Sequence, residues 1–217
     1  NRGSSITMKK GALFLGGDLV ATPQIRKVIC EAVVIGAANG GAERALKLGY
    51  EPTFVVGDLD SISEATIRRL KNTDIYPYAP DKDKSDSELA LEHMLSFSPQ
   101  ELIILGAVGG RLDHALANLY LLSLIPSKVD AKILMKDGEI YFTRKKLKFS
   151  GDIGDLVSIL PQGPRGARIK IEGFYYSLNH EFLKSGSHGL SNRMTQKKVS
   201  IEVFKGALYV VHYFKKG

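Results

Sequence analysis

Cysteine and long apolar runs are scarce in this sequence of 217 residues, which has a single cysteine, Cys30. A lone thiol excludes a disulfide framework and a cysteine-rich zinc site, and it fits a reducing compartment, so we expect a cytoplasmic protein. No apolar run approaches the roughly 18 residues of a membrane-spanning helix, so we expect no membrane partner. The composition, 44% hydrophobic and 24% charged, is that of a globular protein and excludes disordered, collagen-like and coiled-coil chains.

Acidic residues become scarce in the last third of the chain. Residues 143–217 hold 14 Lys and Arg against 5 Asp and Glu, whereas residues 1–142 hold 16 against 18. This asymmetry indicates two modules, or a basic face for an anionic partner. A solvated lysine-rich surface is the simpler interpretation of the excess, because net charge alone governs solubility and non-specific binding.

Short apolar runs alternate with helical patterns in the first part of the chain. Continuous apolar runs indicate strands that are buried on both faces, as in a parallel sheet. The runs are 12–15, 32–38, 54–56 and 102–105, and the helical patterns are 42–48, 63–70, 85–95 and 111–124. This rhythm predicts an open, mostly parallel α/β sheet.

After about residue 138 the apolar residues alternate with period two, which predicts a small antiparallel β-sandwich. Charge and periodicity change together there. We therefore expect an α/β domain over 8–138 and a β-sandwich domain over 139–217. The small polar residues 1–7 are interpreted as an appended remnant outside the fold.

Two carboxylates follow the third apolar run directly, at Asp58 and Asp60. Ligands of open α/β sheets bind outside the carboxyl ends of the strands. Alternate residues of an extended segment point the same way, so both acids can converge on one cation, and Mg²⁺ binds through one or two carboxylates plus substrate phosphates. The alternative is a turn in which Asp58 caps a helix, although capping needs only one acid.

A second acidic loop runs from Asp81 to Asp86 and leads into a capping box that begins at Ser85. It resembles a calcium loop superficially, but Asp86 stands where that loop requires glycine, so an EF-hand is excluded. Asp86 also suits the first turn of a helix without any function. The lysines between the acids are candidates for phosphate contacts.

Two glycine-bearing turns complete the set of loops that carry candidate functional residues. One is Asn39-Gly40-Gly41, and the other leads from Gly109-Gly110 to Arg111, Asp113 and His114. Glycines between a strand and a helix N-terminus can cradle phosphate, and Arg111 can clamp it bidentately. Neither turn matches the dinucleotide-binding fingerprint or the P-loop.

These motifs, taken in order and with their spacing, resemble the thiamine pyrophosphokinase family over nearly the whole chain. The segments that carry the resemblance are 39–42, 57–62, 81–86, 109–114 and 189–192. It implies a transferase that makes thiamine diphosphate and AMP from thiamine and ATP with Mg²⁺. It also implies a homodimer with active sites between subunits.

The resemblance also implies roles for particular residues. Metal ligands and catalytic residues would be Asp58, Asp60 and Asp86. Residues on the ATP side would be Asn39, Gly40, Gly41, Lys82, Lys84, Gly110, Arg111 and Asp113. Residues on the thiamine side would be Asp81, Asp83, Ser191 and Asn192. This chain departs from the family at Asn39, where an Asp is usual, and at Ser85, where a Thr is usual.

Two other functions stay open at this point. The basic second half, with Tyr175, Tyr176 and Arg168 on short strands, could form a nucleic-acid surface. Its basic residues mostly alternate with apolar ones, however, as in any half-buried sheet, so we expect no nucleic-acid partner. A different nucleotide-dependent transferase could also use the same acidic loops.

Overall fold

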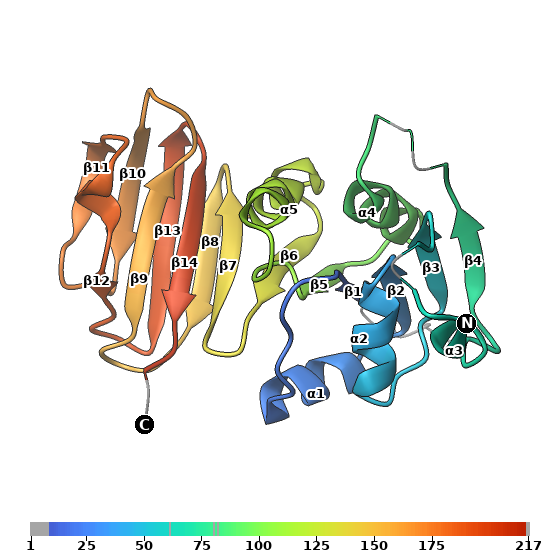
Figure 1. The fold of residues 1–217 in the computed structure, drawn as a ribbon. Coiled ribbons are helices and arrows are strands. Elements are labelled where there is room, and N and C mark those ends of the chain that lie inside the picture. The colour runs from blue at the N-terminus through green and yellow to red at the C-terminus, as the bar shows by residue number, and fades with distance from the viewer. Residues whose placement is uncertain (1–8, 61, 80, 82, 216–217) are drawn as a thin grey trace, which may run out of the picture. The chain divides into compact units, whose positions relative to one another are not determined.

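The computed structural model describes residues 9–60, 62–79, 81 and 83–215 (Figure 1). The chain divides into two compact units, one ending at Lys136 and the other beginning at Asp137. No helix among the described residues is long and apolar enough to cross a membrane.

The N-terminal unit is built on a parallel sheet with the strand order β6-β5-β1-β2-β3-β4. Its strands are β1 (Lys10–Phe14), β2 (Val34–Ala38), β3 (Phe54–Gly57), β4 (Asp74–Pro77), β5 (Glu101–Leu105) and β6 (Asp130–Leu134). Its helices are α1 (Pro23–Cys30), α2 (Gly41–Lys47), α3 (Glu64–Ile67), α4 (Asp86–Ser96) and α5 (Leu112–Leu124). The prediction of an open, mostly parallel α/β sheet is confirmed.

Helices cover both faces of this sheet, which is why its central strands are continuously apolar. The residues of β1 and β5 that follow Lys10 and Glu101 are fully buried. Figure 1 shows α4 and α5 on one side of the strands and α2 and α3 on the other. Strand β1 pairs with both β2 and β5, so the strand order reverses there, and the loops at the carboxyl ends flank the point where such folds bind ligands.

The C-terminal unit is a β-sandwich of two antiparallel sheets, as predicted. One sheet has the order β12-β9-β14-β7 and the other β11-β10-β13-β8. The strands are β7 (Gly138–Thr143), β8 (Lys146–Ser150), β9 (Leu156–Pro161), β10 (Ala167–Glu172), β11 (Leu178–Leu183), β12 (Asn192–Arg193), β13 (Lys198–Lys205) and β14 (Leu208–Tyr213), with a short 3₁₀ turn η1 (Ser187–Gly189). Inward-facing residues of both sheets, including Ile159, Ile169 and Ile201, form one core.

Candidate active site

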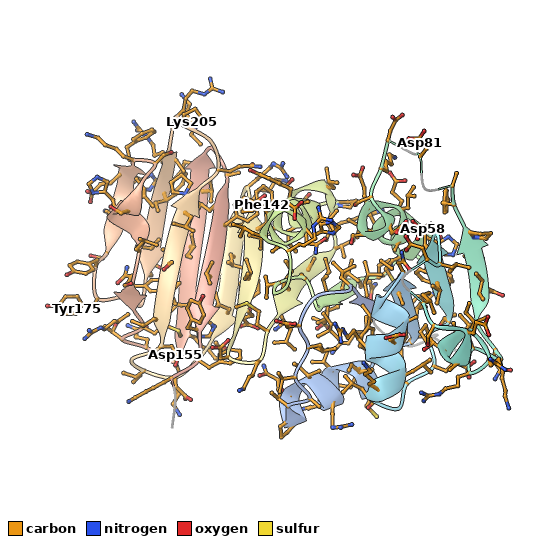
Figure 2. The ribbon with its side chains drawn as sticks, viewed as in Figure 1. Asp58, Asp81, Phe142, Asp155, Tyr175 and Lys205 are labelled. Atoms are coloured by element: carbon orange, nitrogen blue, oxygen red, sulfur yellow. The ribbon has the colours of Figure 1, made fainter. Side chains whose placement is uncertain are left out.

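Polar side chains from neighbouring strands meet at the carboxyl edge of the parallel sheet. The amide nitrogen Nδ2 of Asn39, after β2, lies 2.7 Å from Oδ1 of Asp58 and 3.1 Å from Oδ1 of Asp60, both after β3. The same nitrogen lies 3.1 Å from Oδ2 of Asp86, the first residue of α4. We call these four residues the acidic cluster, and Figure 2 labels Asp58 within it.

The backbone around Asn39 aims its side chain at the carboxylates. Asn39 has a φ of 40°, a left-handed conformation that asparagine tolerates better than most residues. Its main-chain N–H donates to the carbonyl of Val56 at 2.9 Å, which ties the end of β2 to β3. The side chain therefore leaves the strand end beside the loop that carries the two aspartates.

Gly57 makes room for the acidic cluster. Its φ is 152°, and a Cβ at this position would lie 3.0 Å from Cβ of Asn39 and 3.1 Å from Cγ of Asp86. Such contacts are too close for a side chain to fit without displacing its neighbours. Glycine thus lets the carboxylate of Asp86 pack directly on the end of β3.

A tight turn, and not an extended strand end, holds Asp58 and Asp60 together. Leu59 between them has a φ of 65°, and the N–H of Asp60 donates to Oδ1 of Asp58 at 3.2 Å. This is an Asx-type turn, in which an aspartate side chain caps the backbone two residues on. The convergence expected from strand geometry is therefore produced by local turn chemistry.

Two of the glycines predicted on the ATP side, Gly40 and Gly41, lie at the start of α2. Gly40 precedes α2, and Gly41 begins it. A Cβ on Gly41 would lie 2.2 Å from the carbonyl oxygen of Phe14 in β1, so only glycine lets α2 approach that strand. This close packing brings the start of α2 to the same edge as the acidic cluster.

The donor chemistry of the acidic cluster fits Mg²⁺. Carboxylate and amide oxygens are hard ligands, and Oδ1 of Asn39 is a buried atom with no hydrogen-bond partner in the described part of the chain. Within the described ranges, no group of three or more His, Cys, Asp or Glu side chains forms a ready-made metal cage. Mg²⁺ uses only one or two carboxylates when substrate phosphates supply further oxygens, so the residues present suffice.

Four residues of the loop between β4 and α4 were predicted to contact ATP or thiamine: Asp81, Lys82, Asp83 and Lys84. Asp81 and Asp83 are exposed, and Figure 2 shows Asp81 near the tip of the loop, away from Asp58. The ammonium of Lys84 pairs with Glu92 at 2.5 Å, and this hydrogen bond raises the pKa of Lys84. Lys82 lies outside the described residues. Of these predicted contacts, Asp81 therefore lies away from Asp58, and Lys84 is paired with Glu92.

Two glycine segments pack backbone to backbone where the strand order reverses. The N–H of Gly17, after β1, donates to the carbonyl of Gly106, after β5, at 2.8 Å. A Cβ on Gly17 would lie 2.5 Å from the carbonyl oxygens of Gly106 and Val108. Asn118 of α5 fixes the loop by donating to the carbonyl of Ala107 at 3.0 Å. The sequence analysis assigned no role to the segment after β1. The Gly16-Gly17 pair at the end of that strand was the pattern that could have indicated one.

Arg111 and Asp113 pair with each other at the start of α5. Nη2 of Arg111 lies 2.6 Å from Oδ2 of Asp113, and Nε lies 3.1 Å from Oδ1. The hydrogen bond from Arg111 and the N–H of His114 lower the pKa of Asp113 to about 2. Both side chains are mostly exposed, and Gly110 before them has open space around its Cα. A phosphate would have to compete with Asp113 for the guanidinium.

Two of the predicted thiamine residues lie on the β-sandwich: Ser191 falls between η1 and β12, and Asn192 begins β12. Ser191 is exposed, has a φ of 57° and donates its N–H to Oγ of Ser158 at 3.1 Å. Asn192 is buried, and its amide bonds to the main chain: Nδ2 donates to the carbonyl of Tyr176 at 2.8 Å, and Oδ1 accepts from the N–H of Tyr176 at 3.0 Å. The motif thus shapes the backbone at this turn, a role that its Gly, Ser and Asn composition favours.

The fold and the site together define a class of protein: an α/β protein with an acidic cluster at the carboxyl edge of its parallel sheet, where such sheets bind ligands, and with a β-sandwich as its second unit.

Comparison with known families identifies the member of this class. The sequence model for the "Thiamin pyrophosphokinase, catalytic domain" matches residues 25–135, and that for the "Thiamin pyrophosphokinase, vitamin B1 binding domain" matches residues 142–208. The chain belongs to the thiamin pyrophosphokinase family, whose reaction transfers a pyrophosphoryl group from ATP to thiamine.

Individual relatives agree over nearly the full length. The chain is 27% identical to the thiamine pyrophosphokinase of Bacillus subtilis over 210 residues, covering 94% of this chain and 98% of that one. The crystal structure of the Bacillus subtilis thiamine pyrophosphokinase superposes with a TM-score of 0.84 at 24% identity, over 96% of this chain and 100% of that chain. Thiamin pyrophosphokinase from Candida albicans superposes with a TM-score of 0.77 at 16% identity, over 95% and 90% of the two chains.

Proposed function

We propose that this chain transfers the pyrophosphoryl group of ATP to the hydroxyl of thiamine, giving thiamine diphosphate and AMP. The observation that carries the proposal is the convergence of Asp58, Asp60 and Asp86 on Asn39 at the carboxyl edge of the sheet. Membership of the family supports the choice of substrates.

In this reaction the thiamine oxygen bonds to the β-phosphorus of ATP, the bond from that phosphorus to the α-phosphate oxygen breaks, and the hydroxyl loses its proton. AMP leaves with the electrons of the broken bond. Such transfers depend mainly on positioning and on neutralising phosphate charge. A Mg²⁺ ion bound with ATP would supply part of that neutralisation.

The chain's own residues supply the rest. Asp58, Asp60 and Asp86 would hold the metal, and the amide of Asn39 keeps their carboxylates within reach of one point. Gly110 and Arg111 at the start of α5 would face the phosphates, because this loop follows β5 beside the reversal of strand order. Lys82 and Lys84 stay candidates for ATP, and Asp81 and Asp83 for the cationic thiazolium.

Incubation with ATP, Mg²⁺ and thiamine, followed by chromatography for AMP and thiamine diphosphate, tests the proposal. Asp60→Asn should abolish both products and leave the fold intact, since Asp60 is exposed. Asp130→Asn, a matched change at the start of β6, should stay active. A wild-type protein that forms no thiamine diphosphate would contradict the function, and an active Asp60→Asn variant at ordinary Mg²⁺ would contradict the metal assignment.

We place the thiamine site on the β-sandwich, at Ser191 and Asn192. Ser191→Ala removes the hydroxyl that would form one uncharged hydrogen bond with thiamine. We therefore expect the KM for thiamine to rise several-fold while the KM for ATP is unchanged. A selective rise in the KM for ATP would assign this segment to the nucleotide instead.

We also propose that the protein is a cytoplasmic homodimer. Cys30, an exposed free thiol, is compatible with a reducing compartment. The β-sandwich beginning at Asp137 is a small unit whose core gains from a partner surface. Light scattering that gives the mass of one chain, at concentrations where the enzyme is active, would exclude the dimer.

A further inference from the structure

Two phenylalanine rings lie half-exposed on the outer face of the sheet β11-β10-β13-β8. Phe182 of β11 is 49% exposed and Phe204 of β13 is 44% exposed. The ring of His180 stacks on that of Phe204, with the centroids 4.0 Å apart and the planes at 24°. Large apolar side chains gathered on one exposed face indicate an interaction surface.

Strand alternation places a cation between these rings. Ile169 of β10 points into the core, so its neighbour Arg168 points outward, in register with Phe182 on one side and with Lys205 on the other. The register of β10 and β13 shifts there by one residue, so that Phe204 and Lys205 both lie opposite Arg168. Such bulges re-aim side chains, and both residues are exposed. We call His180, Phe182, Phe204, Arg168 and Lys205 the basic-aromatic patch, and Figure 2 shows Lys205 at one end of the sandwich.

The strands that carry the patch are tied together at their ends. The N–H of Gly166, before β10, donates to Oγ of Ser185 at 3.2 Å, and this hydroxyl donates to the carbonyl of Gly163 at 2.5 Å. A Cβ on Gly166 would lie 2.4 Å from the carbonyl oxygen of Leu183, and a Cβ on Gly206 would lie 2.9 Å from that of Gly166. The patch therefore stands on closely packed backbone.

Both cations of the patch are available to a ligand. They are exposed and, in the part of the chain that the structure describes, neither has an ion-pair partner. The outward acids of β10 and β13 lie beside other lysines: Oε1 of Glu172 is 2.7 Å from Nζ of Lys170, and Glu202 lies in register between Lys170 and Lys146. The patch thus keeps a positive charge beside its rings.

We propose that the basic-aromatic patch binds single-stranded RNA. Aromatic side chains on the open face of a four-stranded antiparallel sheet can stack on bases, while cations beside them contact phosphates. Because the patch is exposed, one small ligand on it would stay largely in water, so affinity has to come from repeated contacts along a polyanion. An acidic polypeptide would match the cations but would offer the rings no bases. The proposal goes beyond the proposed function and does not depend on it.

The structure changes the weight of the sequence pattern. The alternation of basic and apolar residues argued against a nucleic-acid partner, because any half-buried sheet shows it. In the structure, that alternation turns Arg168 outward, and Phe182 and Phe204 are exposed with it. A merely solvated face would carry polar side chains at those two positions.

Fluorescence anisotropy with a labelled single-stranded RNA of about 12 nucleotides tests the patch. The wild type should bind, with an affinity that falls steeply as salt rises. Phe182→Ala and Phe204→Ala should each weaken binding about 5- to 100-fold and leave the salt dependence unchanged. Arg168→Gln should weaken binding and reduce the slope of log affinity against log salt by about 0.7.

Matched controls are an exposed ring and an exposed cation elsewhere. Tyr213→Ala, at the end of β14, and Lys128→Gln, in the N-terminal unit, should bind RNA like the wild type. Circular dichroism checks that each variant is folded. If Phe204→Ala does not fold, Phe204→Leu, which keeps an apolar side chain and removes the ring, replaces it.

Four results would overturn the proposal. The first is a wild-type protein that binds no RNA at low salt. The second is equal affinity for duplex RNA, or unchanged affinity in both phenylalanine variants, because either would leave stacking without a role. The third is tighter binding to vesicles of anionic lipid that the same variants lose, which would assign the patch to a membrane surface. The fourth is a changed mass of the phenylalanine variants by light scattering, which would assign it to a second copy of the chain.

Discussion

At the scale of single residues, Asn39 places a neutral amide among the three carboxylates of the acidic cluster. Its amide donates toward three carboxylates that would otherwise repel one another without a cation. An aspartate at this position would replace a donor with a fourth negative charge. The amide therefore keeps the carboxylates gathered before any metal binds.

We predict that Asn39→Asp destabilises the metal-free protein. The change removes hydrogen bonds to carboxylates and adds like charge, so the free energy of unfolding should fall by about 1–3 kcal/mol in chelator. Excess Mg²⁺ should restore much of the loss, because a cation between carboxylates replaces the amide. Urea unfolding with chelator and with Mg²⁺ measures both effects.

The control is Asn179→Asp, at an exposed position of β11, which should change stability little in either condition. An Asn39→Asp variant as stable as the wild type in chelator would mean that the amide does not hold the carboxylates together.

The sequence indicated Asp58, Asp60 and Asp86 for reasons of chain position, and the structure groups them. It could not indicate that Asn39 joins them, because that depends on a φ of 40° and on three distances across different strands. The sequence could not indicate the pairing of Lys84 with Glu92 either. The two residues are eight positions apart, and Lys84 lies before the helix that carries Glu92. Local patterns find the loops, and tertiary geometry decides which side chains meet.

At the scale of elements, buried strands were easier to predict than exposed ones. The runs that became β1, β3 and β5 are continuously apolar, whereas β4 is mostly exposed and carries little apolar signal. Helix α1 was not predicted, although Thr22 caps it by accepting the N–H of Ile25 at 3.2 Å and Pro23 begins it. That Thr-Pro pair is a start signal that the apolar pattern alone does not show.

Gly57 offers a prediction at this scale, because it lets the end of β3 pack against Asp86 at the start of α4. Gly57→Ala combines an unfavourable φ with contacts of 3.0 and 3.1 Å to Asn39 and Asp86. Gly49→Ala has an unfavourable φ of 90° and nothing within 4 Å of the new Cβ. Both should lower the free energy of unfolding, by about 1–3 kcal/mol for the strained backbone.

Only Gly57→Ala should also move Asp86 and so weaken the binding of Mg²⁺ with ATP, measured by calorimetry. Equal effects of the two variants on stability and on binding would show that crowding at Gly57 is unimportant.

At the scale of the whole molecule, each unit holds a histidine in a different environment. His212 of β14 is fully buried, with Nε2 2.7 Å from Oδ2 of Asp155 and Nδ1 3.2 Å from Oε1 of Glu139. Tyr141 also donates to Glu139, and Asp155 accepts the main-chain N–H groups of Asp152 and Lys215. In the N-terminal unit, His93 of α4 is only partly buried and lies among the rings of Phe54, Tyr76 and Phe97.

These environments shift the pKa values of the two histidines in opposite directions. Burial by itself lowers the pKa of His212, but its hydrogen bonds to Glu139 and Asp155 outweigh burial and raise the pKa above 6.5. Burial lowers the pKa of His93 below 6.5, and the more distant Asp74 offsets this only partly. His212 therefore adds stability that is complete below pH 6.5 and is lost as the pH rises through its raised value. His93 adds stability that is present above pH 6.5 and is lost as the pH falls through its lowered value.

We predict that the two units respond oppositely to pH near neutrality. Between pH 8 and pH 5.5, acidification should strengthen the amide protection of the β-sandwich and weaken that of the α/β unit, as measured by native-state hydrogen exchange. Asp155 does not reverse this within that range: its hydrogen bonds outweigh burial and lower its pKa below 3.8, so its contribution is lost only at more acid pH. His212→Gln should remove the pH dependence of the sandwich and leave that of the other unit, and His93→Gln should do the converse. His180→Gln, at an exposed position, should alter neither, and parallel pH slopes for both units in the wild type would contradict the assignment.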